Sequence, residues 1–271
     1  MTTDKSGFQI AGTGPENYER FVGLLMAPFV DAVIQRANLA PGRSVLDVAC
    51  GTGFVARAAA GLVGPSGRIA GLDINEGMLA VARSRAASAG LKAEWHAASA
   101  LDMPFADDEF DAVLCQQGIM FFPDLAKGLS EMARVCAPNG RVVASFWAPM
   151  ESNPYIKAYS EHLSVLLPPG SLATNDAAFR LTLDEVASVL RSAGLENVDA
   201  ETVQGTVTLP PMAEALPMHL SSLPYGPPFA ALDAPTQARF FEDVSLSLNR
   251  YQQPDETFIV PVATHLVSGT R

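Results

Sequence analysis

A glycine-rich turn with an acidic residue in the stretch before it is the part of this chain best suited to chemistry. Residues 44–56 read S-V-L-D-V-A-C-G-T-G-F-V-A. An apolar run that stops at two glycines and continues into a Val- and Ala-rich stretch predicts a strand, a tight turn and a helix. Glycine lets the backbone turn sharply and lets a ligand come close, and the first N–H groups of the helix can face an anionic group. We therefore expect a ligand at the carboxyl end of this strand.

Two carboxylates accompany this turn. Asp47 sits within the apolar strand, where a charge needs a partner, either a backbone N–H of the turn or a cationic ligand. Asp73 ends the second apolar run, twenty residues after Gly53, where a carboxylate can bridge the hydroxyls of a ribose. Residues 51–56 also fit G-x-G-x-x-G/A. These features fit NAD as well as other adenosine-containing ligands.

The elements around the turn alternate between strand and helix. We predict helices over 16–26 and 28–38, strands over 68–73, 92–96, 110–116 and 141–147 after the first one, and helices between them. This order is typical of an α/β, doubly wound and mostly parallel sheet. From 152 onward we expect helices over 152–167 and 182–193, a strand over 198–209, a helix over 236–248 and a strand over 257–268. Residues 1–15 are expected to be flexible. We expect residues 16–271 to form a single domain with a helical cap or lid inserted at about 210–248, before the last strand.

Composition limits the possible functions. The chain has 271 residues and a formal net charge of −11, which disfavours a nucleic-acid partner. The three cysteines, Cys50, Cys115 and Cys136, lie in apolar stretches and predict reduced core residues in a cytoplasmic protein. Short ligand spacings are missing and histidine is scarce, so we expect no metal site. We see neither a signal peptide nor an apolar stretch long enough for a membrane span.

Four motifs in order resemble the class I S-adenosylmethionine-dependent methyltransferases, specifically the small-molecule branch that includes quinone-biosynthesis enzymes. They are V-L-D-V-A-C-G-T-G at 45–53, G-L-D-I-N-E-G-M-L at 71–79, A-L-D-M-P-F-A-D-D-E-F-D-A-V at 100–113 and G-L-S-E-M-A-R-V-C-A-P-N-G-R-V-V at 128–143. The resemblance implies a Rossmann-like sheet of seven strands whose last two form an antiparallel hairpin. It also implies S-adenosyl-L-methionine as the cofactor.

The same resemblance implies roles for individual residues. Asp47 would lie near the methionyl ammonium, Asp73 would bind the ribose hydroxyls, and Tyr18 would close over the cofactor. The remaining residues expected around the cofactor are Ala49, Gly51, Gly53, Ile74, Met78, Ala100 and Gln116. One departure is Ser99, where the family commonly has an aspartate that accepts a bond from the adenine amino group. A hydroxyl accepts that bond more weakly, so weaker cofactor affinity is expected.

Candidates for the acceptor side come from the ends of the fourth and fifth strands and from the cap. His162 and His219 are candidate general bases for a hydroxyl acceptor, although each alone also fits a packing role. The residues expected to contact the acceptor are Gln117, Met120, Phe121, Trp147, Met218 and Tyr225. Ordinary core packing is an equally good interpretation for these six.

The sequence thus predicts transfer of a methyl group to a small, largely apolar acceptor, a metabolite or natural product of secondary metabolism methylated on O, N or C. Two alternatives remain open. One is an NAD(P)-dependent oxidoreductase. Asp47 counts against this alternative, because its carboxylate would repel the pyrophosphate of the nucleotide. The other is a protein of the same fold that binds the cofactor without methylating. An RNA methyltransferase is disfavoured by the acidic charge. The oligomeric state and the acceptor stay open.

Overall fold

The structure is a computed structural model that describes residue 8 and residues 10–271. Much of the segment 1–15, which we expected to be flexible, lies outside these residues. The strands are β1 (Ser44–Val48), β2 (Arg68–Asp73), β3 (Glu94–Ala97), β4 (Phe110–Gln116), β5 (Cys136–Trp147), β6 (Glu196–Leu209) and β7 (Phe258–Thr270). The helices are α1 (Gly14–Ala37), α2 (Phe54–Val63), α3 (Glu76–Ser88), α4 (Leu125–Val135), α5 (Pro154–Leu166), α6 (Ala173–Ala178), α7 (Leu183–Ser192), α8 (Met212–Ser221), α9 (Gly226–Ala230) and α10 (Ala234–Ser247). Single 3₁₀ turns occur at Ile119–Phe121, Met150–Ser152 and Asn249–Tyr251.

The seven strands form one sheet in the order β3-β2-β1-β4-β5-β7-β6. The pairs from β3 to β5 are parallel, whereas β7 pairs antiparallel with both β5 and β6. The predicted doubly wound sheet with a terminal antiparallel hairpin is therefore confirmed. Because the chain crosses from β3 to β4 around β1, the carboxyl ends of β1 and β4 flank a point where the strand order reverses, which is where such sheets bind ligands.

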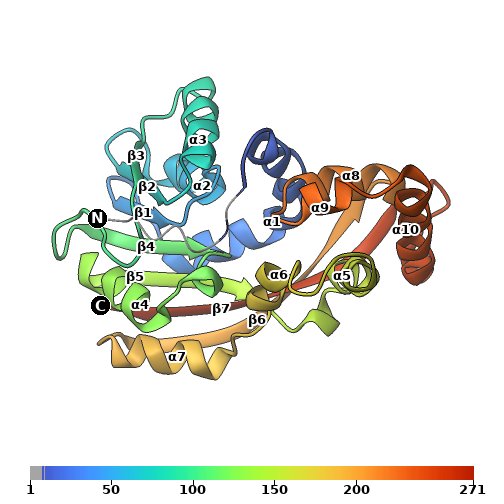
Figure 1. Ribbon diagram of the computed structural model, residues 1–271. Helices are drawn as coiled ribbons and strands as arrows, with labels where there is room; N and C mark the ends of the chain where they lie inside the picture. Colours follow the sequence, from blue (N-terminus) through green and yellow to red (C-terminus); the bar gives the residue numbers. More distant parts are fainter. Residues whose placement is uncertain (1–7, 9) are drawn as a thin grey trace.

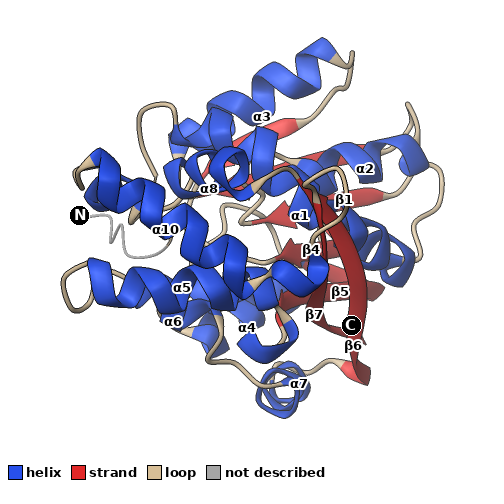
Figure 2. Cartoon of the chain, turned by 90° about the vertical axis from the view of Figure 1, so that its right-hand side faces the viewer, coloured by secondary structure: helices blue, strands red, loops and turns tan. Residues whose placement is uncertain are grey.

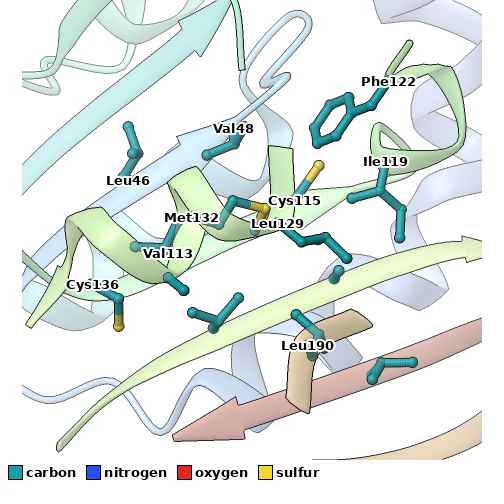
Figure 3. Close-up of a cluster of buried hydrophobic side chains, with 14 of the residues drawn as sticks. Leu46, Val48, Val113, Cys115, Ile119, Phe122, Leu129, Met132, Cys136 and Leu190 are labelled. Atoms are coloured by element: carbon teal, nitrogen blue, oxygen red, sulfur yellow. The ribbon is translucent and has the colours of Figure 1, made fainter. Parts of the chain in front are cut away.

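Helices cover both faces of the sheet. On one face, α4 packs on β4 and β5, and α7 packs on β6, β7 and α4. Their fully buried side chains (Figure 3) include Val113, Leu129, Met132 and Leu190. On the other face, the second half of α1 and the helix α2 contact the alternate side chains of the same strands. Every position of β1 after Ser44 is buried. Burial on both faces explains why Val45, Leu46 and Val48 are all apolar, and it leaves Asp47 as the one buried carboxylate of this strand.

A second apolar cluster lies beyond the carboxyl ends of the parallel strands. The long strands β6 and β7 extend beyond the ends of the parallel strands, and α5, α8, α9 and α10 gather around their far ends together with the first half of α1 (Figures 1 and 2). We call α8, α9 and α10, which lie between β6 and β7, the cap. Its buried side chains include Leu216, Phe229, Phe240 and Val244.

Two expectations about local structure need correction. The two predicted helices over 16–38 are one helix, α1, with Pro28 inside it. Proline removes a hydrogen bond there, but the helix buries an unbroken apolar face on both sides of Pro28, including Leu25 and Phe29. The strand predicted over 141–147 begins earlier, at Cys136, as β5. The short helix α6 was not predicted from the sequence.

Candidate functional site

The turn after β1 is tight, and three of its residues have left-handed backbone conformations. Ala49, Gly51 and Gly53 all have positive φ, at 52°, 53° and 83°. The Gly51 N–H donates to Asp73 Oδ2 at 2.8 Å, which joins this turn to the end of β2. A Cβ added at Gly51 would lie 4.0 Å from the ring of Tyr18, in the space between the turn and α1. Glycine therefore keeps room for a ligand between the turn and Tyr18.

Asp73 lies at the end of β2 with spare hydrogen-bonding capacity. Besides the Gly51 bond, its Oδ1 accepts from the Asn75 N–H at 2.8 Å. A carboxylate offers about four lone-pair sites, so Asp73 can also accept bonds from a ligand. Burial raises the pKa of Asp73, and the backbone N–H bonds oppose that rise. Burial and the Asp73 charge also raise the pKa of the Tyr18 hydroxyl.

Asp47 finds its partner inside the protein. It is 2% exposed, and its Oδ2 accepts from the Ala56 N–H in the first turn of α2 at 2.9 Å. The residue preceding that helix is Gly53, which has no side chain to cap it. Burial raises the pKa of Asp47 to about 7, and the Asp73 charge adds to the rise. Asp47 thus caps the N-terminus of α2. Because its pKa is raised to about 7, it carries less negative charge and would repel a pyrophosphate less strongly than the sequence suggested.

This position predicts a pH effect on stability. A carboxyl group whose pKa is about 7 in the folded protein keeps a proton that the unfolded chain loses near pH 4. The free energy of unfolding should therefore fall as pH rises between these values. Asp47→Asn keeps an oxygen for the Ala56 N–H but cannot ionise. We expect urea unfolding to show a flatter pH dependence in this variant, by at least about 1.4 kcal/mol, which corresponds to one pKa unit.

The same variant also tests the role in cofactor binding. If Asp47 acts only as a helix cap, Asp47→Asn should bind S-adenosylmethionine as tightly as the unaltered chain. A large loss of affinity with an unchanged pH dependence of stability would show that the charge serves the ligand instead.

A cavity opens at the carboxyl ends of β1, β2, β4 and β5 and continues under α5, α6 and the cap. One end is formed by the turn after β1, the end of β2 and the loop after β3. The other end is formed by the ends of β4 and β5 and by side chains from α5, α6, α8 and the segment before α9. Aromatic and aliphatic side chains make most of the wall, and α1 borders the cavity along both parts.

Most of the residues predicted from the sequence line this cavity. They are Tyr18, Ala49, Gly51, Asp73, Ile74, Met78, Ser99, Ala100 and Gln116 at the first end, and Gln117, Met120, Phe121, Trp147, His219 and Tyr225 toward the second. The Ser99 hydroxyl accepts from the Leu101 N–H at 3.1 Å, which shapes the loop after β3.

Four predicted residues lie elsewhere. Asp47 is beneath α2, as described. Gly53 faces Trp95, whose ring would be 2.7 Å from an added Cβ. His162, on α5, lies 3.0 Å from the Ser247 hydroxyl of α10, outside the cavity lining. Met218 packs against the cap cluster. For His162 and Met218, the packing of α5 and α8 decides which side of each helix faces the cavity.

Several lining residues had no prediction. Tyr159, Asn175 and Phe179 come from α5, α6 and the residue after α6, and Phe8 comes from the segment before α1. Tyr155 and Tyr159 are spaced four apart on one helix, which places them on one face. That spacing is the signal that could have indicated an aromatic face on α5.

The second end of the cavity combines flat apolar walls with a few polar atoms. Trp147 and Phe179 stack with ring centroids 6.0 Å apart. The Tyr225 hydroxyl donates to the Tyr159 hydroxyl at 3.2 Å. His219 is 4% exposed, and its Nδ1 lies 3.1 Å from the Tyr155 hydroxyl. Burial lowers the pKa of His219 to about 3, so its imidazole is neutral.

Gln117 of the cavity wall is held in place by a chain of hydrogen bonds. It has a φ of 54° and is buried. Its Nε2 donates to the Thr264 hydroxyl at 2.7 Å, and that hydroxyl donates in turn to the Phe146 carbonyl at 2.8 Å. This chain fixes which amide atom is the donor. Gln117 Oε1 remains buried without a partner among the described residues.

A seven-stranded sheet with a reversed last strand, a glycine turn after β1 and an acid after β2 define the class I methyltransferase fold. Comparison with known proteins agrees. A family model described as a methyltransferase domain matches residues 45–140. An uncharacterized protein of Mycobacterium tuberculosis is 33% identical over 175 residues, which are 62% of each chain. The ubiquinone/menaquinone biosynthesis C-methyltransferase UbiE of Cupriavidus taiwanensis is 35% identical over 181 residues, covering 61% of this chain and 72% of that one.

Solved structures show the same fold. An S-adenosylmethionine-dependent methyltransferase from Aquifex aeolicus matches with a TM-score of 0.54 at 22% identity, over 70% of this chain and 91% of that chain. The [4+2]-cyclase SpnF matches with a TM-score of 0.59 at 18% identity, over 99% of this chain and 88% of that chain. This chain belongs to the class I S-adenosylmethionine-dependent methyltransferases and, within them, resembles the UbiE type. Among the described residues, no helix has the length and apolar character needed to cross a membrane.

Proposed function

We propose that this chain transfers the methyl group of S-adenosylmethionine to a small, largely apolar acceptor. The main support for this proposal is that one continuous cavity reaches from Asp73 and Gly51 to Trp147, His219 and Tyr225. One end has the features of a nucleoside site and the other has apolar walls with isolated polar atoms. A cofactor and an acceptor in the same enclosed space is the arrangement that a direct transfer requires.

The residues at the first end fit the cofactor. Asp73 has lone pairs to spare for ribose hydroxyls, and the glycine at Gly51 leaves the space that a Cβ would fill. Ile74 and Met78 provide apolar contacts for a flat base, and Ser99 lies beside them. When bound, the cofactor supplies a methyl group already activated by its positive sulfur.

The protein then has two tasks. Trp147, Phe179 and Tyr225 hold the acceptor between apolar surfaces, and the cap with α1 keeps water out. Positioning and exclusion of water account for much of the rate when the transferred group is already activated. Because Leu223 and Tyr225 of the cap segment form part of the wall, we infer that the cap moves as a lid to admit the acceptor.

Isothermal titration calorimetry tests the cofactor. We expect binding of S-adenosylmethionine and S-adenosylhomocysteine in the micromolar range, and no heat from NADH. Native mass spectrometry of the purified chain should show co-purified S-adenosylhomocysteine. Binding of NADH with no binding of S-adenosylmethionine would instead support an oxidoreductase.

A non-methylating role is the second candidate. The observation in its favour is that a [4+2]-cyclase shares this fold over nearly the whole chain. The two functions differ in the fate of the cofactor. A methyltransferase incubated with its acceptor releases S-adenosylhomocysteine. A non-methylating enzyme of this fold converts its substrate and leaves the bound S-adenosylmethionine intact.

A further inference from the structure

A histidine held among aromatic rings faces the second end of the cavity. His219 stacks on Phe21 and on Tyr155, with ring centroids 4.8 and 5.4 Å apart, and the Tyr159 ring meets it edge-on at 5.3 Å. These contacts come from α1, α5 and α8, so the imidazole orientation is set by three helices. Its Nδ1 lies 3.1 Å from the Tyr155 hydroxyl.

The hydrogen bond of the Tyr155 hydroxyl determines which ring nitrogen of His219 carries the proton. Tyr155 is 1% exposed, and its hydroxyl bonds only to His219 among the described residues. If Nδ1–H donated to Tyr155, the phenol proton would be left buried without an acceptor, which is costly. The phenol therefore donates to Nδ1. A neutral imidazole has one N–H, so that proton is on Nε2.

The other ring nitrogen is the one available to a ligand. His219 lines the cavity, and Nε2 makes no hydrogen bond within the described part of the chain. Tyr159 and Tyr225 lie on the same wall. They share one hydrogen bond, so one of their two hydroxyl protons is also left over.

We propose that Tyr155 fixes His219 as the Nε2–H tautomer, so that His219 offers a hydrogen-bond donor to the acceptor. Tyr155 is then a positioning residue. This inference rests on the proposed function for the identity of the site, and it replaces the expected role of His219 as a general base. The matching ligand carries a carbonyl or similar oxygen on an apolar frame, because such an oxygen accepts from Nε2–H and from a tyrosine hydroxyl.

NMR of the free protein labelled with ¹⁵N in its imidazole rings tests the tautomer. The chain has four histidines, and loss of one signal in His219→Gln assigns the ring. We expect His219 to show a protonated Nε2 and an unprotonated Nδ1. In Tyr155→Phe the signals should move toward a mixture of tautomers, while the His162 and His265 signals stay unchanged. A protonated Nδ1 in the unaltered chain, or an unchanged tautomer in Tyr155→Phe, overturns the proposal.

Two probes of nearly equal shape test the donor role. Acetophenone carries a carbonyl oxygen where α-methylstyrene carries a CH₂ group. We expect acetophenone to shift the His219 Nε2–H signal several-fold more than α-methylstyrene at the same concentration. His219→Phe should weaken acetophenone binding roughly 2- to 12-fold, the range for one neutral hydrogen bond. His219→Gln, which keeps an N–H donor, should lose less.

Equal responses to the two probes, or no response to acetophenone, contradict the donor role. These measurements need neither cofactor nor turnover. A protonated Nδ1 in a protein that binds S-adenosylmethionine would contradict this inference and leave the proposed function intact. A protonated Nε2 in a protein that does not bind S-adenosylmethionine would contradict the proposed function and leave the tautomer assignment intact.

Discussion

Asp73→Ala is expected to lower the affinity for S-adenosylmethionine by about 1–3 kcal/mol, roughly 5- to 150-fold. The variant removes the carboxylate that we expect to accept the ribose hydroxyls. It also frees the N–H groups of Gly51 and Asn75, each now 2.8 Å from an Asp73 oxygen. The turn after β1 and the start of α3 would lose their common anchor. Calorimetry with S-adenosylhomocysteine, alongside thermal unfolding of the same samples, measures both effects.

Asp111 offers a matched control. Its carboxylate also accepts a backbone N–H, that of Ser44 at 2.7 Å, but near the starts of β1 and β4, away from the cavity. Asp111→Ala should cost stability and leave cofactor affinity unchanged. Asp73→Asn, which keeps one carbonyl oxygen, should lie between Asp73→Ala and the unaltered chain. Unchanged affinity in a folded Asp73→Ala would remove Asp73 from the cofactor site.

Phe240→Ala is expected to destabilise the protein by about 3–5 kcal/mol, because it leaves a cavity in the cap cluster. Phe240 on α10 is 1% exposed, and its ring packs on Phe229 of α9 with centroids 4.9 Å apart. Val244 and Leu248 are buried beside it in the same cluster. The cap therefore shares one buried core with α1, α5 and the far ends of β6 and β7. Urea unfolding gives the free energy, and hydrogen exchange should show α8, α9 and α10 losing protection together.

The next residue provides the comparison. Phe241 has the same side chain on the same helix but is only partly buried. Phe241→Ala should therefore cost about 1 kcal/mol. Similar losses in the two variants would show that the cap is loosely packed. Faster exchange of the cap than of the sheet in the unaltered protein, slowed when cofactor and acceptor are both bound, would support a moving lid.

The sequence by itself predicted the doubly wound sheet and most of the residues at the end of the cavity that we propose for the cofactor. The alternation of apolar strands and helices, the glycines at 51 and 53 and the acid at Asp73 act over short distances along the chain. Local backbone rules and strand periodicity are enough to place such features. The resemblance to the class I methyltransferases, rather than local rules, allowed the residues around Asp73, from Gly51 to Ser99, to be proposed in advance as neighbours.

Only the tertiary structure decided what happens where segments far apart in the chain meet. Pro28 should end a helix by local rules, yet burial of Leu25 and Phe29 keeps α1 continuous. Asp47 had two possible partners, and the path of the turn brings the Ala56 N–H to it.

The two histidines show the same limit most clearly. Nothing near His162 or His219 in sequence distinguishes them, but α5 turns one toward Ser247, and α8 places the other between Phe21 and Tyr155. Burial and hydrogen bonding set the proton on an imidazole. Those depend on the packing of α1, α5 and α8, which comes from contacts between residues up to about two hundred positions apart.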